Sequence, residues 1–188
     1  MKPTPKRRRI AKVEPPTPEI PRRLIAIDAS STAAGWSLFE CGELRRVDVI
    51  RARDIPIEAR ADDLASRVWL AIRACNVAPN DLVVFEKTSG RHAMARPYAV
   101  AEAAFTQGVI WAATGAIRVR RERFAEADWM RGFRGDLRDK KKRAEWLAAA
   151  EPVYGEFLGS RGDPGFDGAD ATALGLWRMG RIGRGDGK

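Results

Sequence analysis

The stretch RLIAIDASSTAAGWSLFE (residues 23–40) decides the fold of this chain. It contains two apolar runs, LIAID, which ends in Asp28, and GWSLFE, which begins with Gly35 and Trp36, with the small polar segment ASSTAA between them. The next segment, LRRVDVIRA (44–52), alternates apolar and polar residues. Short runs of this kind, separated by small residues, are typical of strands. We therefore predict three strands joined by short turns, which is two hairpins in succession.

The rest of the chain alternates helical and strand patterns. Residues 59–75 place apolar side chains on one helical stripe, and LVVFE (82–86) is short and continuously apolar, as buried strands are. Further elements are expected as a helix at 97–114, a strand at 116–122, shorter helices at 125–130 and 139–150, and a final helix at 167–178. This order predicts an α/β fold with a mixed five-stranded sheet and helices on both faces.

Composition narrows the class of protein. The chain has 188 residues, enough for one domain with a sizeable core, and it contains no run of eighteen apolar residues that could cross a membrane. Its two cysteines and single histidine supply neither a zinc-ligand set nor a disulfide framework. The N-terminal segment MKPTPKRRRI has no apolar run of a secretory signal behind it. We expect a protein of the reducing cytoplasm with no membrane segment.

The net charge of +9 is concentrated at the two ends. Residues 1–23 carry eight basic and two acidic side chains, residues 178–188 carry four and one, and the middle is formally neutral. We predict a disordered, basic, proline-rich arm at 1–22, a folded domain at 23–178 and a basic, glycine-rich tail at 179–188. Basic arms suit a polyanionic partner such as DNA, and the alternative is charge that serves solubility.

Four carboxylates stand out by position. Asp28 and Glu86 close two apolar strands, and Asp167 and Asp170 are three apart at the start of the last helix, on one face. A charge at the end of a buried strand needs a partner or a metal. Oxygen ligands without histidine or thiol favour Mg²⁺ or Mn²⁺. The alternatives are a turn former for Asp28, a surface pair with Lys87 or Arg91 for Glu86, and helix capping by Asp167.

These motifs resemble the RuvC-type Holliday junction resolvases of the ribonuclease-H-like superfamily. The strand ending in Asp28, followed by Gly35 and Trp36, resembles the family's first motif, and LVVFEK resembles the strand that bears the second acid, here Glu86. AEAAFTQGVIWAA resembles the family's helix with a Gln-x-Gly-Val-like turn. FDGADATALGLW resembles its closing helix with Asp167 and Asp170, and LRDKKKRAEWL its basic segment.

The chain also departs from the bacterial pattern. Ala29 and Ser30 replace a common Pro-Gly pair, a variant associated with phage-encoded relatives, and Ser89 stands where an aromatic residue often stacks on junction bases. The N-terminal arm has no counterpart in that pattern. If the aromatic wedge is missing, residues of the same region such as Arg91, His92 or Tyr98 are the candidates to replace it.

The resemblance implies a ribonuclease-H-like fold, branched DNA as the substrate and phosphodiester hydrolysis with two Mg²⁺ or Mn²⁺ ions. Asp28 would bridge the ions, with Glu86 and Asp167 or Asp170 completing the ligand shells. Lys140 or Lys141 would offset charge on the phosphate, against the alternative of a solvated helix face. The resemblance further implies a homodimer, and the need for a helicase partner stays open. The expected DNA-binding residues are Arg91, His92, Arg96, Arg131, Arg134, Arg138, Lys142 and Arg143.

Two other functions remain open at this level. The same fold and metals could act on forks or flaps, and a protein with this fold could bind DNA without cleaving it. Five tryptophans lie in apolar stripes and are expected in the core or a dimer interface, whereas Trp129 is not assigned.

Overall fold

In a computed structural model of the chain, residues 20–88 and 97–182 are described. They form one five-stranded sheet in the order β3-β2-β1-β4-β5. The strands are β1 (Arg23–Ala29), β2 (Ala33–Glu40), β3 (Glu43–Arg51), β4 (Leu82–Lys87) and β5 (Arg120–Ala125). Strands β1, β2 and β3 pair antiparallel, while β4 is parallel to both β1 and β5. The two successive hairpins and the mixed sheet are confirmed.

Alternation along β1 divides the core into two halves. Ile25 and Ile27 point into a cluster with the buried side of α1, whereas Leu24 and Ala26 belong to a second cluster that contains α6. All four side chains are at most 1% exposed. Because successive strand residues face opposite sides, the sheet buries apolar area on both faces.

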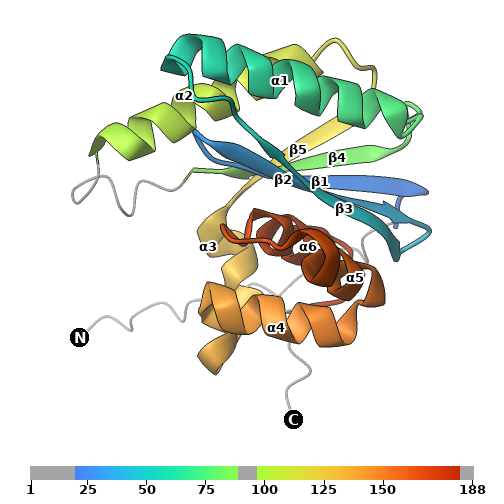
Figure 1. Cartoon of the computed structure of the whole chain (residues 1–188). Coiled ribbons are helices and arrows are strands. Elements are labelled where there is room, and N and C mark those ends of the chain that lie inside the picture. The colour runs from blue at the N-terminus through green and yellow to red at the C-terminus, as the bar shows by residue number, and fades with distance from the viewer. Residues whose placement is uncertain (1–19, 89–96, 183–188) are drawn as a thin grey trace, which may run out of the picture.

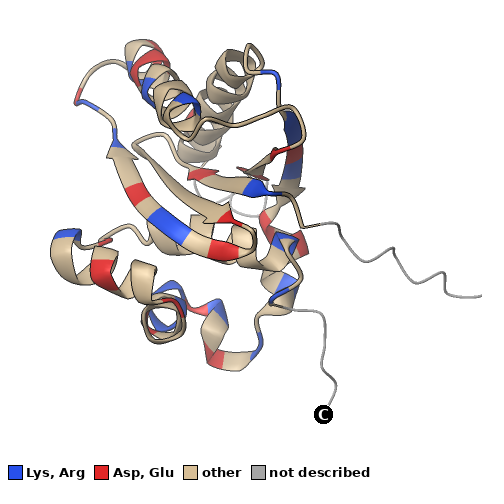
Figure 2. Cartoon of the chain, turned by 90° about the vertical axis from the view of Figure 1, so that its right-hand side faces the viewer, with Lys and Arg blue, Asp and Glu red and all other residues tan. Residues whose placement is uncertain are grey.

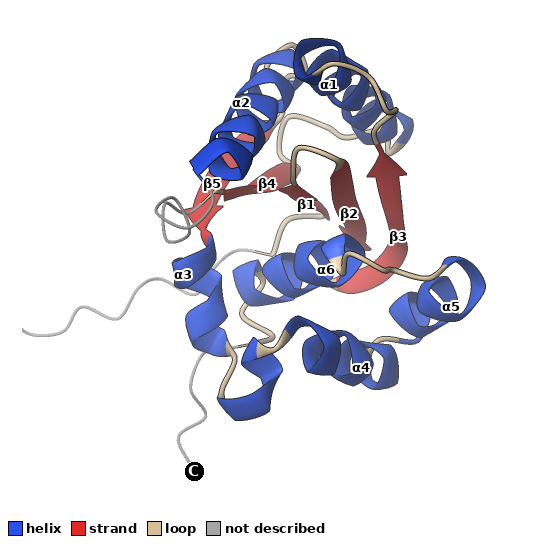
Figure 3. Cartoon of the chain, turned by 60° about the vertical axis from the view of Figure 1, so that its left-hand side comes forward, coloured by secondary structure: helices blue, strands red, loops and turns tan. Residues whose placement is uncertain are grey.

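The helices are shared between those two faces, as Figures 1 and 3 show. Helices α1 (Ile57–Ala74) and α2 (Pro97–Thr114) pack against each other over one face. The other face carries α3 (Glu126–Trp129), α4 (Lys140–Ala150), α5 (Pro152–Arg161) and α6 (Asp167–Arg178), with short 3₁₀ turns at Met130–Gly132 and Gly135–Arg138. Helix α6 lies directly on β1 and β2. The predicted α/β architecture is confirmed.

Two elements differ from the sequence-based expectation. Strand β5 occupies Arg120–Ala125 rather than 116–122, because Gly115, Ala116 and Ile117 donate their backbone N–H groups back to carbonyls at the end of α2. Those residues finish the helix and have no free donor for a strand ladder. Helix α5 was not predicted.

The edge strand β3 carries a mixed charge. Figure 2 shows basic and acidic segments interspersed along it. Arg46 pairs with Asp48 at 3.3 Å, and Arg161 of α5 reaches the same carboxylate at 3.0 Å. Among the described residues, no helix is long and apolar enough to span a membrane.

Candidate active site

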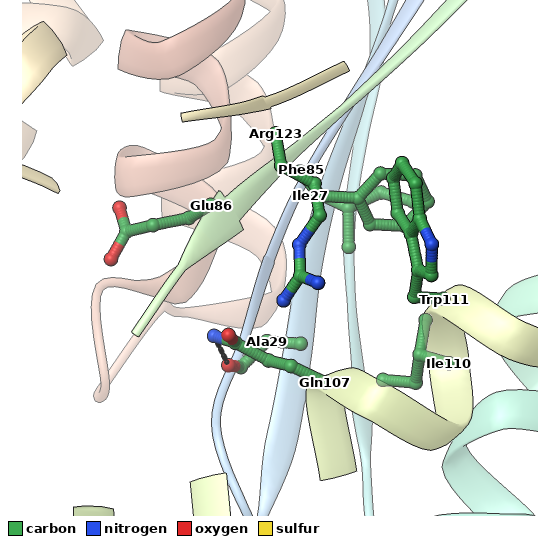
Figure 4. Close-up of a pocket in the computed structure, with 8 residues that line it drawn as sticks. All are labelled: Ile27, Ala29, Phe85, Glu86, Gln107, Ile110, Trp111 and Arg123. Atoms are coloured by element: carbon green, nitrogen blue, oxygen red, sulfur yellow. Dashed lines mark hydrogen bonds between the residues drawn. The ribbon is translucent and has the colours of Figure 1, made fainter. Parts of the chain in front are cut away.

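The two parallel central strands bring their final acids to the same place. Ile27 pairs with Phe85 in the β1–β4 ladder, so the next residues, Asp28 and Glu86, follow side by side at the carboxyl ends. Alternation then turns both away from the α1–α2 face and toward α6. Figure 4 shows Glu86 projecting to the opposite side of the sheet from Trp111. Open sheets gather ligands at this edge.

Helix α6 adds two further carboxylates to that end of the sheet. Asp167 and Asp170 lie in its first turn, and Asp170 is only 3% exposed. Gly35 of β2 makes the approach possible, because a Cβ on it would lie 2.0 Å from the carbonyl oxygen of Asp167. The first turn of α6 therefore packs directly against the backbone of β2 at Gly35.

The start of α6 is held by Asp163, so Asp167 is not needed as a cap. Oδ2 of Asp163 accepts hydrogen bonds from the backbone N–H of Ala169 at 2.9 Å and from the hydroxyl of Tyr154 at 3.1 Å. Phe166 at the N-cap position makes no side-chain capping bond. The alternative reading of Asp28 as a turn former is also wrong, since Ser30 makes the turn through the backbone N–H of Ala33 at 3.0 Å.

The four carboxylates interact with one another. Burial raises the pKa of Asp28 well above its usual range, and the charges of Glu86 and Asp170 raise it further. Burial likewise raises the pKa of Glu86 to about 8, with Asp170 and Glu126 adding to the effect. The pKa of Asp167 is raised mainly by burial. Buried acids such as Asp28, Glu86 and Asp167, whose raised pKa values disfavour the charged form, are typical of a functional site that binds a cation.

One lysine reaches this cluster. Nζ of Lys140 lies 2.7 Å from Oδ2 of Asp170, and although partial burial opposes it, the Asp170 carboxylate raises the pKa of Lys140. Lys141 is 75% exposed and pairs with Glu145 at 4.0 Å, so in this structure its side chain is not placed with the four carboxylates. The sequence offered either Lys140 or Lys141 as the lysine of the site, and in α4 it is Lys140 that lies next to the carboxylates.

Arg143 is a second correction, because it was expected on the DNA-binding surface. It is 1% exposed, and its Nε donates to Oδ1 of Asp170 at 3.0 Å. Lys142 is exposed and pairs with Asp136 at 2.6 Å. Arg131, Arg134 and Arg138 are exposed, as a surface role requires. Arg91, His92 and Arg96 lie outside the described residues.

The site residues that sequence reasoning missed are Gln107 and Trp129. Gln107 of α2 donates from Nε2 to the carbonyl of Ala29 at 2.7 Å and accepts from the backbone N–H of Thr88 at 2.8 Å, which ties the ends of β1 and β4 together (Figure 4). Trp129 donates its indole N–H to Oε2 of Glu86 at 2.8 Å. The sequence signal for Gln107 was a single amide side chain within the apolar segment AFTQGVI. A polar group in such a segment is expected to be buried and hydrogen-bonded.

The donor set fits hard divalent cations. All four acids offer oxygen, Asp28 is only 9% exposed, and no donor among the described residues bonds its carboxylate. As the side chains lie, no three Asp, Glu, His or Cys groups in the described part of the chain enclose a single ion position. The ammonium of Lys140 instead supplies the local positive charge to Asp28, Asp167 and Asp170.

Solved structures of RuvC have a similar fold. RuvC of Thermus thermophilus in complex with Holliday junction substrate matches with a TM-score of 0.59 and 16% identity, over 86% of this chain and 98% of that one. A second Thermus thermophilus RuvC structure matches with a TM-score of 0.56, 18% identity and the same two coverages.

A viral resolvase has the same architecture. Fowlpox virus resolvase, in a complex with Holliday junction DNA, matches with a TM-score of 0.55 and 12% identity, over 84% of this chain and 99% of that one. No protein-family model and no curated protein sequence matches the chain. The predicted ribonuclease-H-like fold of the RuvC type is therefore confirmed from structure, at identities where sequence comparison finds nothing.

Proposed function

We propose that this protein is a divalent-metal-dependent endonuclease that cleaves branched DNA, with the four-way Holliday junction as its substrate. One observation carries the proposal. The acids Asp28, Glu86, Asp167 and Asp170 converge with Lys140 at the carboxyl ends of β1 and β4, in a fold shared with RuvC and a viral resolvase. Fold alone does not define chemistry, so the acidic cluster is the stronger support.

The proposed mechanism assigns each residue a task. Two Mg²⁺ or Mn²⁺ ions, when bound, would supply Lewis acidity for the attacking water and for the leaving 3′ oxygen. Asp28, whose charge interacts with the other three acids, would hold both ions, with Glu86 as a ligand on the β4 side. Asp167 and Asp170 would supply the ligands from α6. Lys140, half exposed, would turn its ammonium from Asp170 to the scissile phosphate.

DNA contacts are proposed for the basic residues around this site. Arg131, Arg134 and Arg138 are exposed in the segment that leads into α4, and Lys142 is exposed in the first turn of α4. Such groups bind phosphates and position the duplex without reading its sequence. Arg91, His92 and Arg96 are proposed to select the branched shape, because they follow Glu86 within ten residues of sequence.

We further infer a homodimer, so that two sites can meet two strands of one junction. Exposed apolar side chains on α1 and α2 support it, since Leu70 is 57% and Phe105 47% exposed. The proposed setting is the cytoplasm of a bacterial cell, in a phage-like member of the resolvase type. Sedimentation of the purified protein tests the dimer.

A cleavage assay tests the proposed function. Purified protein with Mg²⁺ is incubated with end-labelled four-way, three-way, flap and linear DNA, beside Asp28→Asn as the control. We expect cleavage of the four-way junction, and Asp28→Asn should bind the junction without cutting it, because a ligand and a negative charge beside the phosphate are removed. Cleavage of forks or flaps in preference would establish the alternative substrate. Binding without cleavage in Mg²⁺ and Mn²⁺ would establish a DNA-binding protein.

A further inference from the structure

A buried chain of contacts links two of the acids from behind. Trp129, 1% exposed, donates its indole N–H to Oε2 of Glu86 at 2.8 Å. Arg143, also 1% exposed, donates from Nε and Nη2 to Oδ1 of Asp170, at 3.0 and 2.5 Å. The Arg143 guanidinium carbon lies 5.4 Å from the centre of the Trp129 ring. Glu86 of β4 and Asp170 of α6 are thus joined through two residues that lie behind the site.

Both linking side chains are fixed by further contacts. Nη1 of Arg143 donates to the carbonyls of Leu137 and Arg138, at 3.0 and 3.3 Å. The Trp129 ring packs edge-on against Phe133, with ring centres 6.0 Å apart. Arginine keeps its charge at any ordinary pH, so its bonds to Asp170 persist. These contacts hold both donors in place inside the core.

Each carboxylate therefore has one oxygen that is bonded by a buried residue and one that is not. Among the described residues, no donor bonds Oε1 of Glu86. Oδ2 of Asp170 is held by Nζ of Lys140, a flexible side chain that is 52% exposed. Oε2 of Glu86 and Oδ1 of Asp170 are bonded by the buried residues Trp129 and Arg143, whereas Oε1 and Oδ2 are not. Oδ1 of Asp170 accepts two hydrogen bonds, so a metal ion bound to it would have to displace one of them. Oε2 of Glu86 accepts one, which makes it the weaker ligand oxygen of that carboxylate.

We propose that Trp129 and Arg143 are positioning residues that restrict Glu86 and Asp170 to one metal-binding oxygen each, Oε1 and Oδ2, and that this restriction selects Mg²⁺ and Mn²⁺ over Ca²⁺. The inference rests on the proposed metal-dependent function. Mg²⁺ demands six ligands in near-octahedral geometry, whereas Ca²⁺ takes six to eight and often binds a carboxylate through both oxygens. Hydrogen bonds behind a ligand typically change metal affinity 10- to 100-fold.

A purely structural role would not require this arrangement. A buried ion pair such as Arg143–Asp170 is commonly replaceable by apolar residues without loss of stability. An indole could also fill the space beside Phe133 while its N–H found a backbone carbonyl. In this chain both side chains instead donate to proposed metal ligands, Trp129 to Glu86 of β4 and Arg143 to Asp170 of α6.

The test measures metal binding without DNA. Mn²⁺ dissociation constants are obtained from the electron paramagnetic resonance of free Mn²⁺, and Ca²⁺ constants by competition, for the full chain and for Trp129→Phe. We expect Trp129→Phe to weaken Mn²⁺ binding about 10-fold and to leave Ca²⁺ binding equal or tighter. Trp146→Phe is the matched control, because Trp146 packs on the same Phe133 at 6.1 Å and is 37% exposed. Its metal constants should equal those of the wild type.

A second variant keeps the test decisive if Trp129→Phe fails to fold by circular dichroism. Arg143→Lys retains the charge beside Asp170 and removes the two-nitrogen grip, and it should lower the ratio of Mn²⁺ to Ca²⁺ affinity in the same direction. Equal loss for both ions, or no loss in either variant, overturns the inference. Asp28→Asn, which should abolish Mn²⁺ binding, shows that the site is being measured. A shifted ratio in a protein that cleaves no branched DNA would overturn the proposed function and leave this inference standing.

Discussion

Gly35 lies opposite Asp28 in the β1–β2 ladder, where α6 comes closest to the sheet. A Cβ there would lie 2.0 Å from the Asp167 carbonyl oxygen and 2.7 Å from the Gly168 nitrogen, and neither backbone atom can turn aside as a side chain could. We expect Gly35→Ala to lose about 1–3 kcal/mol of stability and to remove cleavage, because α6 and its acids must shift. Thermal unfolding and the junction assay check this.

Gly159 supplies the control for that substitution. It lies exposed in α5, and a Cβ on it meets no atom within 4 Å. Gly159→Ala should therefore be neutral, or stabilise by up to about 1 kcal/mol through helix propensity. Equal behaviour of the two variants would show that the contact between Gly35 and Asp167 does not set the position of α6.

Glu86 gives a prediction about pH. Burial raises its pKa to about 8, so the folded protein binds this proton more tightly than the unfolded chain, whose glutamate has a pKa of about 4.3. Stability without divalent ions should then be greatest below about pH 4 from this group and decline as pH rises toward 8. Glu86→Gln removes that decline. Thermal unfolding in EDTA from pH 5 to about 8 measures the slope for both proteins.

The exposed Glu145, in the same helix as Lys140, is the control for the pH series, since its side chain is 62% exposed. Glu145→Gln should keep the wild-type slope. Added Mg²⁺ should stabilise the wild type and not Glu86→Gln. Only the charged carboxylate can bind the cation, and binding to the folded state raises the free energy of unfolding. An unchanged slope in Glu86→Gln would mean that its burial does not disfavour the charged form.

At the scale of elements, α2 sets the spacing of the two central strand ends. Gln107 is 7% exposed and bonds the Ala29 carbonyl and the Thr88 N–H, one residue beyond Asp28 and two beyond Glu86. We expect Gln107→Ala to lose about 1–3 kcal/mol, the usual result of leaving buried polar groups without partners. If the proposed function holds, cleavage should slow while junction affinity changes little, because Gln107 is buried and bonds only backbone groups.

Single-turnover rates and binding constants, measured on the same junction, separate the two effects for Gln107. Gln107→Glu is the companion variant, because its oxygen can still accept from Thr88 while the bond to Ala29 is removed. It should fall between the wild type and Gln107→Ala. Equal loss of affinity and rate would instead place Gln107 at the DNA surface.

The sequence predicted those elements whose apolar pattern is strong and local. Helices α2 and α6 fall on their expected bounds, because Pro97 and Asp167 mark clear starts. Helix α5 was missed since PVYGEFLGSR contains two glycines and little periodicity. It is held by burial of Tyr154 and Phe157 in the core beside β3, which is a long-range contact. The hydroxyl of Tyr154 also donates to Asp163, nine residues further along the chain. Tertiary packing overrides weak local propensity there.

The site shows a similar division between local and long-range information. All four acids could be selected from the sequence, because two stand at the ends of apolar strand patterns and two at the start of the last helix. The run RDKKKR contains basic residues that look equivalent in sequence, and only the helix phase fixed by packing distinguishes buried Arg143, site-facing Lys140 and exposed Lys141. Trp129 was equally hidden, because its partner Glu86 is 43 residues away.

At the scale of the whole molecule, the uneven distribution of charge gives a prediction about the proposed binding of DNA. Residues 1–19 carry six basic and two acidic side chains and lie outside the described residues, while the carbonyl of Arg22 already bonds into the fold by accepting from the Cys41 N–H at 2.8 Å. Deleting 1–19 should therefore leave the fold unchanged and weaken binding to four-way and linear DNA by the same factor. For every phosphate that the arm no longer neutralises, the slope of log affinity against log salt should become shallower by about 0.9.

Binding titrations at several salt concentrations, on both DNA shapes, measure that slope. Deletion of 183–188, which holds two basic residues and one acidic residue, is the matched control and should change the slope less. Shape preference and the cleavage rate of bound junction should survive both deletions, because the carboxylates and Lys140 all lie within the described fold. A loss of preference for the four-way junction on removing 1–19 would instead assign the recognition of shape to the arm, and an unaltered slope would mean that the arm does not touch phosphate.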